Sequence, residues 1–220
     1  MDNLSYDFLA DSDIYVYQRK DMFRINTDTS LLAKFMTIKK GERVLDVGTN
    51  NGALLLAASR KQPSFMYGVD IQEEAIELAR YNMQQQHIEN VELICEDFKT
   101  ASLPKVQVIL CNPPYFKVHD GANLNESETL RKARHETYLE LSQLCQKVSS
   151  LLDEKGRFYL VHRANRIAEI ICELRKNRLE IRTLQFVYDE QKEEAITVLI
   201  EAVKDGKVNA HVAKGIYVKR

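Results

Sequence analysis

Short apolar runs alternate with amphipathic stretches from about residue 43 to residue 202 of this chain. Runs rich in aliphatic and β-branched residues predict strands, and apolar residues spaced three and four apart predict helices. The predicted strands are 43–47, 65–69, 91–95, 106–111, 157–162, 179–187 and 195–202. The predicted helices are 52–60, 73–87, 136–152 and 165–176, and Gly156 is expected to end the third of them.

This alternation predicts an α/β fold, Rossmann-like, with a seven-stranded, mostly parallel sheet and helices on both faces. Only residues 188–194 separate the last two strands, which is too short for a parallel crossover. We therefore expect an antiparallel C-terminal hairpin. The whole chain, 1–220, is predicted to be one domain: a core over 41–220 and an N-terminal extension over 1–40. Within that extension, Thr27 or Asp28 is expected to cap a helix through Leu31, Leu32, Phe35 and Met36, which would cover the ligand pocket.

The amino-acid composition is that of an ordinary globular protein and narrows the function little. The 220 residues carry a formal net charge of −1 and 45% hydrophobic residues. Residues 131–182 hold 12 basic and 7 acidic residues, which allows a locally basic surface or two solvated helix faces. The four cysteines fit no zinc pattern, and those at Cys95, Cys111 and Cys172 stand in apolar runs, which favours buried reduced thiols. We expect a cytoplasmic location, no membrane or metal partner, and a monomer.

The first predicted strand leads into a glycine-rich turn, Asp46-Val-Gly-Thr-Asn-Asn-Gly52. Such a strand–turn–helix unit lets the backbone approach a ligand, although dinucleotide enzymes share it. The acidic Asp46 before the turn disfavours a pyrophosphate and suits a cation. S-adenosylmethionine carries a sulfonium and an amine, and it is the cofactor we expect. Gly48, Asn50 and Gly52 would border it.

Two further strands also end in acidic residues. Asp70 closes the second strand, and a carboxylate there is suited to accept both ribose hydroxyls. After the third strand, Asp97 is a candidate acceptor for an adenine amine, with Phe98 or Ile71 flanking the ring. Each aspartate alone would more commonly be a helix cap or turn residue. Their occurrence at three successive strand ends favours the binding role.

The fourth strand runs into Asn112-Pro-Pro-Tyr115, the most informative stretch of the chain. Prolines 113 and 114 fix the backbone. The amide of Asn112 and the carbonyl of Pro113 can then accept the N–H groups of a planar amine, which directs its lone pair toward a methyl donor. Tyr115 offers a flat face for stacking, worth about 1–3 kcal/mol per base. The alternative is a Pro-Pro loop with an ordinary surface tyrosine.

Together these motifs resemble the amino-methylating branch of class I methyltransferases, and in particular the bacterial tRNA1(Val) adenine-N6 methyltransferases. The likeness covers essentially the whole chain, including Phe23–Asp28, Ala133–Glu136 and Val161–Arg163. It implies that Thr27 and Asp28 lie near the methionine end of the cofactor and that Asn112–Tyr115 hold the target adenine. It also implies that Arg134 and His135 face the RNA. The family's middle glycine is Asn50 here, and asparagine is the best alternative to glycine if that position needs a positive φ.

An adenine beside an anticodon lies in an open loop, so extruding it costs little. Phosphate contacts would still be needed. The candidate RNA contacts are Arg131, Lys132, Arg134, His135 and Arg163. Residues that would extend this patch are Arg166, Arg175, Lys176, Arg178, Lys214, Lys219 and Arg220, although plain solvation is the simpler interpretation for most helical ones.

Other functions share the tetrapeptide. Glutamine methylases of release factors present it to a side-chain amide, but they usually carry a helical N-terminal domain. An N-methyltransferase of guanine or adenine in ribosomal RNA is a further alternative, and the ribosomal guanine methylases use a related loop, commonly with phenylalanine in place of tyrosine and a duplicated N-terminal domain. DNA adenine methylases usually need a target-recognition domain. A non-catalytic, cofactor-binding RNA module would predict a degraded tetrapeptide, whereas Asn112–Tyr115 is intact.

Overall fold

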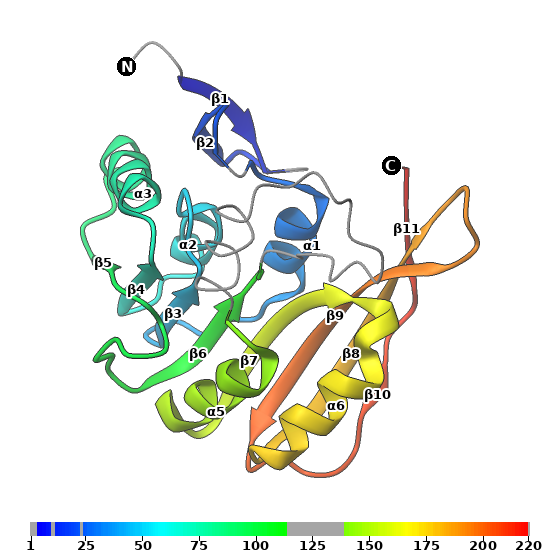
Figure 1. Ribbon diagram of the computed structural model, residues 1–220. Helices are drawn as coiled ribbons and strands as arrows, with labels where there is room; N and C mark the ends of the chain where they lie inside the picture. The colour runs from blue at the N-terminus through cyan, green and yellow to red at the C-terminus, as the bar shows by residue number, and fades with distance from the viewer. Residues whose placement is uncertain (1–3, 10–11, 23, 114–138, 220) are drawn as a thin grey trace, which may run out of the picture.

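A nine-stranded sheet forms the centre of the molecule, with strand order β10-β8-β9-β7-β6-β3-β4-β5 and β11 also paired to β8 (Figure 1). This computed structural model describes residues 4–9, 12–22, 24–113 and 139–219. The strands of the sheet are β3 (Arg43–Val47), β4 (Phe65–Asp70), β5 (Val91–Cys95), β6 (Val106–Cys111), β7 (Leu152–Arg163), β8 (Leu179–Asp189), β9 (Ala195–Lys204), β10 (His211–Val212) and β11 (Ile216–Val218).

All seven predicted strands are present. Strands β3 to β7 pair in parallel, and β9 is antiparallel to both β7 and β8, so the predicted C-terminal hairpin is confirmed. The two additional strands, β10 and β11, are short and pair in parallel with β8 on the side away from β9. A parallel strand ends with its carboxyl terminus at one edge of the sheet. The loops after β3, β4, β5, β6 and β7 therefore meet there.

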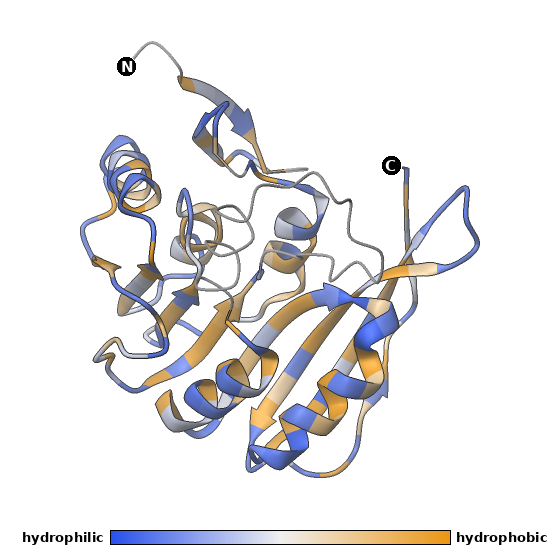
Figure 2. Cartoon of the chain, in the orientation of Figure 1, coloured by the Kyte–Doolittle hydropathy of each residue, from blue (hydrophilic) through white to orange (hydrophobic). Residues whose placement is uncertain are grey.

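Helices cover both faces of the sheet. They are α1 (Thr27–Phe35), α2 (Ala53–Ser59), α3 (Glu73–Gln85), α5 (Leu141–Leu151) and α6 (Ile167–Lys176), with a 3₁₀ turn η1 (Ala164–Arg166). Alternate residues of each central strand enter different cores. On β6, for example, Val108 and Leu110 pack toward α1 and α2, while Ile109 and Cys111 pack toward α5 and α6. Figure 2 shows the central strands as predominantly hydrophobic and the helices as banded. This period of two assigns alternate residues of each strand to the cores on opposite faces of the sheet.

The N-terminal segment adds a separate two-stranded sheet, which the sequence did not reveal. Strands β1 (Leu4–Phe8) and β2 (Tyr15–Arg19) pair antiparallel beside α3. The side chain of Asn82 on α3 holds the backbone of Tyr17 by accepting its N–H at 2.8 Å and donating to its carbonyl at 3.0 Å. Asn82 also donates to the carbonyl of Asn51 at 2.9 Å. The hairpin is thereby linked to the turn that follows β3.

Several local predictions were wrong. Asn26, rather than Thr27 or Asp28, caps α1, because its side chain accepts the Thr29 N–H at 3.0 Å. The helix predicted over 136–152 begins at Leu141, because Glu140 and Gln143 form a reciprocal capping box. Residues 136–138 lie outside the described chain.

Gly156 does not end this helix, which instead passes directly into strand β7. The glycine lies inside β7, where the register with β6 shifts. A Cβ at Gly156 would stand 2.8 Å from the carbonyl oxygen of Asp153. Cys95 and Cys172 are exposed rather than buried, because they occupy outward positions at the end of an edge strand and on α6. No helix among the described residues is long and apolar enough to cross a bilayer.

Candidate active site

A cavity of about 300 Å³ opens at the carboxyl edge of the sheet, where the loops after β3 to β7 meet α1. The turn after β3 forms its floor. Gly48 and Asn50 have φ values of 70° and 48°, and Gly52 has 79°. Asn50 thus adopts the positive φ for which asparagine is the best alternative to glycine. A Cβ on Gly48 would meet nothing within 4 Å, whereas one on Gly52 would stand 2.8 Å from Met83 Cε. Gly52 thus serves helix packing, and Gly48 leaves the cavity open.

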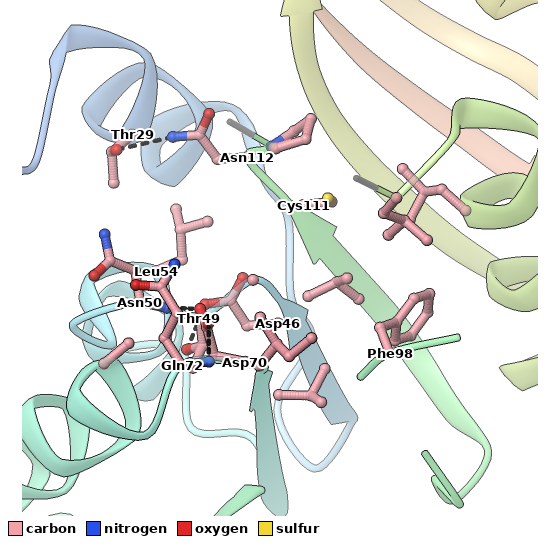
Figure 3. A pocket seen from close by; sticks show the side chains of 18 of the residues that line it. Thr29, Asp46, Thr49, Asn50, Leu54, Asp70, Gln72, Phe98, Cys111 and Asn112 are labelled. Carbon is pink, nitrogen blue, oxygen red and sulfur yellow. Dashed lines mark hydrogen bonds between the residues drawn. The ribbon is translucent and has the colours of Figure 1, made fainter. Parts of the chain in front are cut away.

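Asp46 lies at the base of this cavity and is 1% exposed. Its Oδ2 accepts the hydroxyl hydrogen of Thr49 at 2.8 Å (Figure 3), whereas its Oδ1 accepts no hydrogen bond from any described residue. Burial raises the pKa of Asp46 to about 7, and the nearby charge of Asp70 adds to this, while the Thr49 hydroxyl opposes it. A buried carboxylate without a full set of partners favours a cation in the cavity.

Asp70, at the end of β4, fixes the shape of the same turn. Its Oδ2 accepts the backbone N–H of Asn50 at 2.9 Å, and its Oδ1 accepts that of Gln72 at 3.0 Å (Figure 3). Burial raises the pKa of Asp70, and the backbone hydrogen bonds oppose that rise. Each carboxylate oxygen has a second lone-pair site, so these bonds leave capacity for hydroxyl donors.

The loop after β5 supplies a third side of the cavity. Asp97 accepts the Lys99 backbone N–H at 2.9 Å and forms an ion pair with Lys99 Nζ at 3.3 Å, so it acts as a turn residue as well as lining the cavity. Phe98 is 6% exposed, and Lys147 Nζ lies 5.5 Å from its ring centroid. Ile71, 44% exposed, lines the cavity from the end of β4.

Asn112 follows β6 and stands on the opposite side of the cavity from these acidic loops. Its Nδ2 donates to Oγ1 of Thr29 on α1 at 2.9 Å (Figure 3), which fixes the orientation of the amide plane. Pro113 also lines the cavity. The helix α1 that follows the N-terminal hairpin therefore positions the first residue of the tetrapeptide.

Next to Asn112 in the sheet order, the end of β7 brings basic groups into the cavity lining. His162, Arg163 and Arg166 all border it, as does Arg24 from the segment before α1. Burial lowers the pKa of His162 to about 4, and the charge of Arg166 acts in the same direction. The imidazole is therefore neutral at neutral pH, and the arginines carry the positive charge on this side.

The structure brings together most of the predicted site residues. Those lining the cavity are Asp46, Gly48, Asn50, Asp70, Ile71, Asp97, Phe98, Asn112, Pro113 and Arg163. Thr27 is exposed, and Asp28 is 4% exposed with its Oδ1 accepting from Thr197 on β9 at 3.3 Å, so neither borders the cavity. Their contact with a cofactor stays a prediction. Gly52, also predicted to border the cofactor, is not among the cavity-lining residues. The remaining predicted residues, Pro114, Tyr115, Arg131, Lys132, Arg134 and His135, lie outside the described residues.

A family described as a methyltransferase domain matches residues 38–204. The chain belongs to this family. Over 208 residues, this methyltransferase is 29% identical to the tRNA1(Val) (adenine(37)-N6)-methyltransferase of Flavobacteriaceae bacterium strain 3519-10, covering 92% of this chain and 86% of that protein. A protein of the same name from Aliivibrio fischeri (strain ATCC 700601 / ES114) is 32% identical over 136 residues, or 60% of this chain and 57% of that one.

Solved structures confirm the fold of the methyltransferase. The Trm5 protein of Methanocaldococcus jannaschii, solved in complex with adenosine, matches with a TM-score of 0.68 at 15% identity, over 93% of this chain and 56% of that one. A predicted O-methyltransferase from Agrobacterium tumefaciens matches with a TM-score of 0.67 at 18% identity, over 87% of each chain. At these low sequence identities, the two structures support a shared fold and nothing about substrate.

This methyltransferase uses S-adenosylmethionine as its methyl donor. The cavity fits that cofactor on the grounds of charge. The buried Asp46 Oδ1 accepts no hydrogen bond from the described residues, and the positive φ at Gly48 opens the backbone toward the cavity. Both features suit a ligand that carries a sulfonium and an amine. Among the described residues, no group of His, Cys, Asp or Glu is arranged to hold a metal.

The sequence interpretation missed several residues that build this methyltransferase site. Thr29 and Arg24 belong to a segment with no strong strand or turn signal, and Asn82 lies on a helix far from every motif. Their roles depend on contacts between distant parts of the chain, 83 positions apart for Thr29 and Asn112. Thr49 was detectable, since a hydroxyl three residues after a buried aspartate is a common local acceptor–donor pair.

Proposed function

We propose that this methyltransferase transfers a methyl group from S-adenosylmethionine to the exocyclic N6 of an adenine next to the anticodon of a tRNA, in the cytoplasm. The names of the relatives support the substrate, because both proteins compared above act as tRNA1(Val) (adenine(37)-N6)-methyltransferases. The observation that carries the proposal is Asn112, which is held by Thr29 between an acidic and a basic half of one cavity.

The acidic half is where the cofactor would bind. Asp46 would face the cationic groups of the methionine portion, and its burial makes it a strong acceptor once ionised. Asp70 would receive the ribose hydroxyls, with the Asn50 and Gln72 N–H groups keeping its carboxylate in place. Asp97 would accept from the adenine amine, with Ile71 and Phe98 beside the ring.

Asn112 would act on the target amine. The nitrogen of an adenine amine is a weak nucleophile because its lone pair is delocalised into the ring. An amide oxygen that accepts one of its N–H groups draws the amine out of conjugation and orients the lone pair. The Thr29 hydroxyl fixes the amide by accepting from Nδ2, which leaves the oxygen side to the substrate.

The bound cofactor supplies an electrophilic methyl group with a neutral thioether as leaving group. The chain itself needs no strong general base, because the N–H proton becomes acidic once the nitrogen is methylated. Its contribution is to position the amine, through Asn112 and the carbonyl of Pro113, and to exclude water from the cavity. Tyr115 and Pro114 complete the tetrapeptide in the sequence, and stacking on Tyr115 remains part of the proposal.

The test uses purified protein, labelled S-adenosylmethionine and total tRNA from a strain that lacks the gene. We expect label in N6-methyladenosine after digestion of the tRNA. Label in ribosomal RNA or in a protein fraction, with none in tRNA, would overturn the substrate and retain the methyltransferase. The Asn112→Ala variant should bind the cofactor normally and lose turnover by about two to three orders of magnitude. Asn90→Ala, an exchange of an asparagine outside the cavity, is the matched control.

A further inference from the structure

The charges that line the cavity are sorted by strand. In the sheet order β5-β4-β3-β6-β7, carboxylates lie in or just after the carboxyl ends of β5, β4 and β3, the neutral Asn112 follows β6, and two arginines lie at and just after the end of β7. The carboxylates are Glu96, Asp97, Asp70 and Asp46. One half of the opening therefore suits a cation and the other an anion, with the reactive position at the boundary.

Two of the three described arginines that line the cavity come from one short stretch of chain. Arg163 is the last residue of β7, and Arg166 ends the 3₁₀ turn that follows it. The register of β6 and β7 pairs Cys111 with Leu160, so β7 continues past Asn112 and carries Arg163 to the rim. His162, the neighbour of Arg163 on β7, is buried and neutral and adds no charge.

We call these two arginines the rim pair. The guanidinium of Arg166 is fixed by its neighbours. Arg166 donates through Nε to Glu169 at 2.8 Å and through Nη2 to the same carboxylate, and its Nη1 lies 3.4 Å from His162 Nε2. A guanidinium carries five N–H donors in a rigid plane, so pairing with one carboxylate is compatible with a second anionic acceptor. Arg163 is half-buried at the cavity lining.

We propose that the rim pair, Arg163 and Arg166, binds a backbone phosphate of the nucleotide whose base enters the cavity. This inference rests on the proposed function and adds the group that distinguishes a nucleotide from a bare base or a side-chain amide. A guanidinium matches a phosphate in a bidentate manner. With the base against Asn112, the sugar and its phosphate leave the cavity on the β7 side, away from the carboxylates.

Other arginines in the same region differ in position. Arg175 lies in the last turn of α6, nine residues beyond Arg166. At the rise of an α-helix, this places it about 14 Å from Arg166 along the helix axis. Arg175 forms an ion pair with Glu180, at the end of the sheet opposite the cavity, with 3.5 Å between Nε and Oε1. Arg175 therefore does not extend the basic rim of the cavity, which agrees with the solvation interpretation for this helical residue. Arg175→Gln removes the same charge from an ion-paired arginine far from the cavity and provides a matched control.

The experiment measures the binding of an anticodon stem-loop RNA to the full-length protein saturated with S-adenosylhomocysteine, over a range of salt concentrations. We expect Arg163→Gln and Arg166→Gln each to weaken binding about tenfold or more, since a charge-assisted hydrogen bond contributes at least that much. Replacing both arginines together should also reduce the slope of log affinity against log salt by about 0.7, the value for one lost phosphate contact. Arg175→Gln should change neither quantity.

A second comparison isolates the phosphate. With the same cofactor product bound, the wild-type protein should prefer adenosine 5′-monophosphate to adenosine, and Arg163→Gln with Arg166→Gln should abolish that preference. The affinity of these variants for S-adenosylhomocysteine serves as a check of correct folding, and it should equal that of the wild type. Arg166→Lys should keep most of the salt slope and lose affinity, because lysine retains the charge without the planar fork.

The two proposals fail in different ways. A wild-type protein that labels no tRNA nucleoside defeats the proposed function. A wild-type protein that methylates tRNA, with rim-pair variants whose RNA affinity and salt slope equal those of Arg175→Gln, leaves the function intact and overturns the phosphate site.

Discussion

The buried carboxyl of Asp46 should make the cofactor-free protein less stable as the pH rises. Its pKa is raised from 3.8 to about 7, chiefly by burial. Between these values the folded state holds a proton that the unfolded state has released, so stability is lost as the pH rises through this interval. At about 1.4 kcal/mol per pH unit, the penalty reaches about 4 kcal/mol above pH 7. Asp46→Asn keeps the size of the side chain and removes the titration.

Urea denaturation of the wild type and Asp46→Asn from about pH 4 to about pH 8 measures this penalty directly. The difference in unfolding free energy should grow by about 4 kcal/mol in favour of the variant. Asp21→Asn is a control of opposite sign, because the hydrogen bond from Arg19 lowers the pKa of Asp21. A difference between wild type and Asp46→Asn that does not vary with pH would refute the reasoning.

The same carboxyl should link cofactor binding to pH. A cationic ligand favours ionised Asp46, so wild-type affinity for S-adenosylmethionine should increase as the pH rises toward about 7 and then level off. Asp46→Asn should bind more weakly above pH 7 and show a flatter profile, as calorimetry at each pH would reveal. Parallel profiles for the two proteins would mean that Asp46 does not face the cofactor's charge.

Three further predictions follow from single contacts. Asn82→Ala removes three hydrogen bonds from a 1% exposed side chain and should cost about 2–4 kcal/mol of unfolding free energy, measured with urea, with weaker cofactor binding. Gly52→Ala should lower the free energy of unfolding by at least about 1 kcal/mol, because φ at this position is 79° and the new Cβ meets Met83. Adding Met83→Ala should relieve only the steric part of this loss. Thr29→Val should lower kcat about tenfold at unchanged KM for the cofactor, and Thr29→Ser should restore kcat. Equal kcat values for the wild type and Thr29→Val would show that Asn112 is oriented without the Thr29 hydroxyl.

The sheet and half of the cavity were predictable because they depend on local sequence. Strands such as Arg43–Val47 and Val106–Cys111 are apolar runs bounded by turn residues, and their predicted limits match the structure. Asp46 and Asp70 end such runs, so the rule that parallel strands end at one edge was enough to bring them together.

Helix limits were less predictable because the capping interactions compete. Asn26, Thr27 and Asp28 all suit an N-cap, and the chain uses the first of them. Thr27 is then the first helical residue. Asp28 accepts a hydrogen bond from Thr197, and it is Thr29 that borders the site.

Gly156 shows a different limit of the sequence interpretation. A glycine after an amphipathic helix commonly ends it. Here the helix ends at Leu151 because β7 begins at Leu152 and pairs at once with Val106. Lys155, with φ 59°, and Gly156 form the irregularity that restores the register before Arg157. Pairing with a strand distant in sequence therefore overrode the local stop signal.

The N-terminal segment has more influence on the site than its position outside the central sheet suggests. Leu9, Ile14 and Val16 belong to the same core cluster as Leu32 and Leu110, so these three residues are part of the packed interior. Asn82 binds β2 and the cofactor turn with one side chain, and Gln18 Oε1 accepts the backbone N–H of the cavity residue Ile25 at 2.6 Å.

These contacts give the hairpin two routes to the chemistry. One runs through Asn82 to the turn at Asn51, and the other runs through Ile25 and α1 to Thr29, which orients Asn112. Disturbing the hairpin should therefore affect both cofactor affinity and turnover, whereas disturbing Thr29 should affect turnover alone. The comparison of Asn82→Ala with Thr29→Val separates the two routes, because only the former alters the affinity for the cofactor.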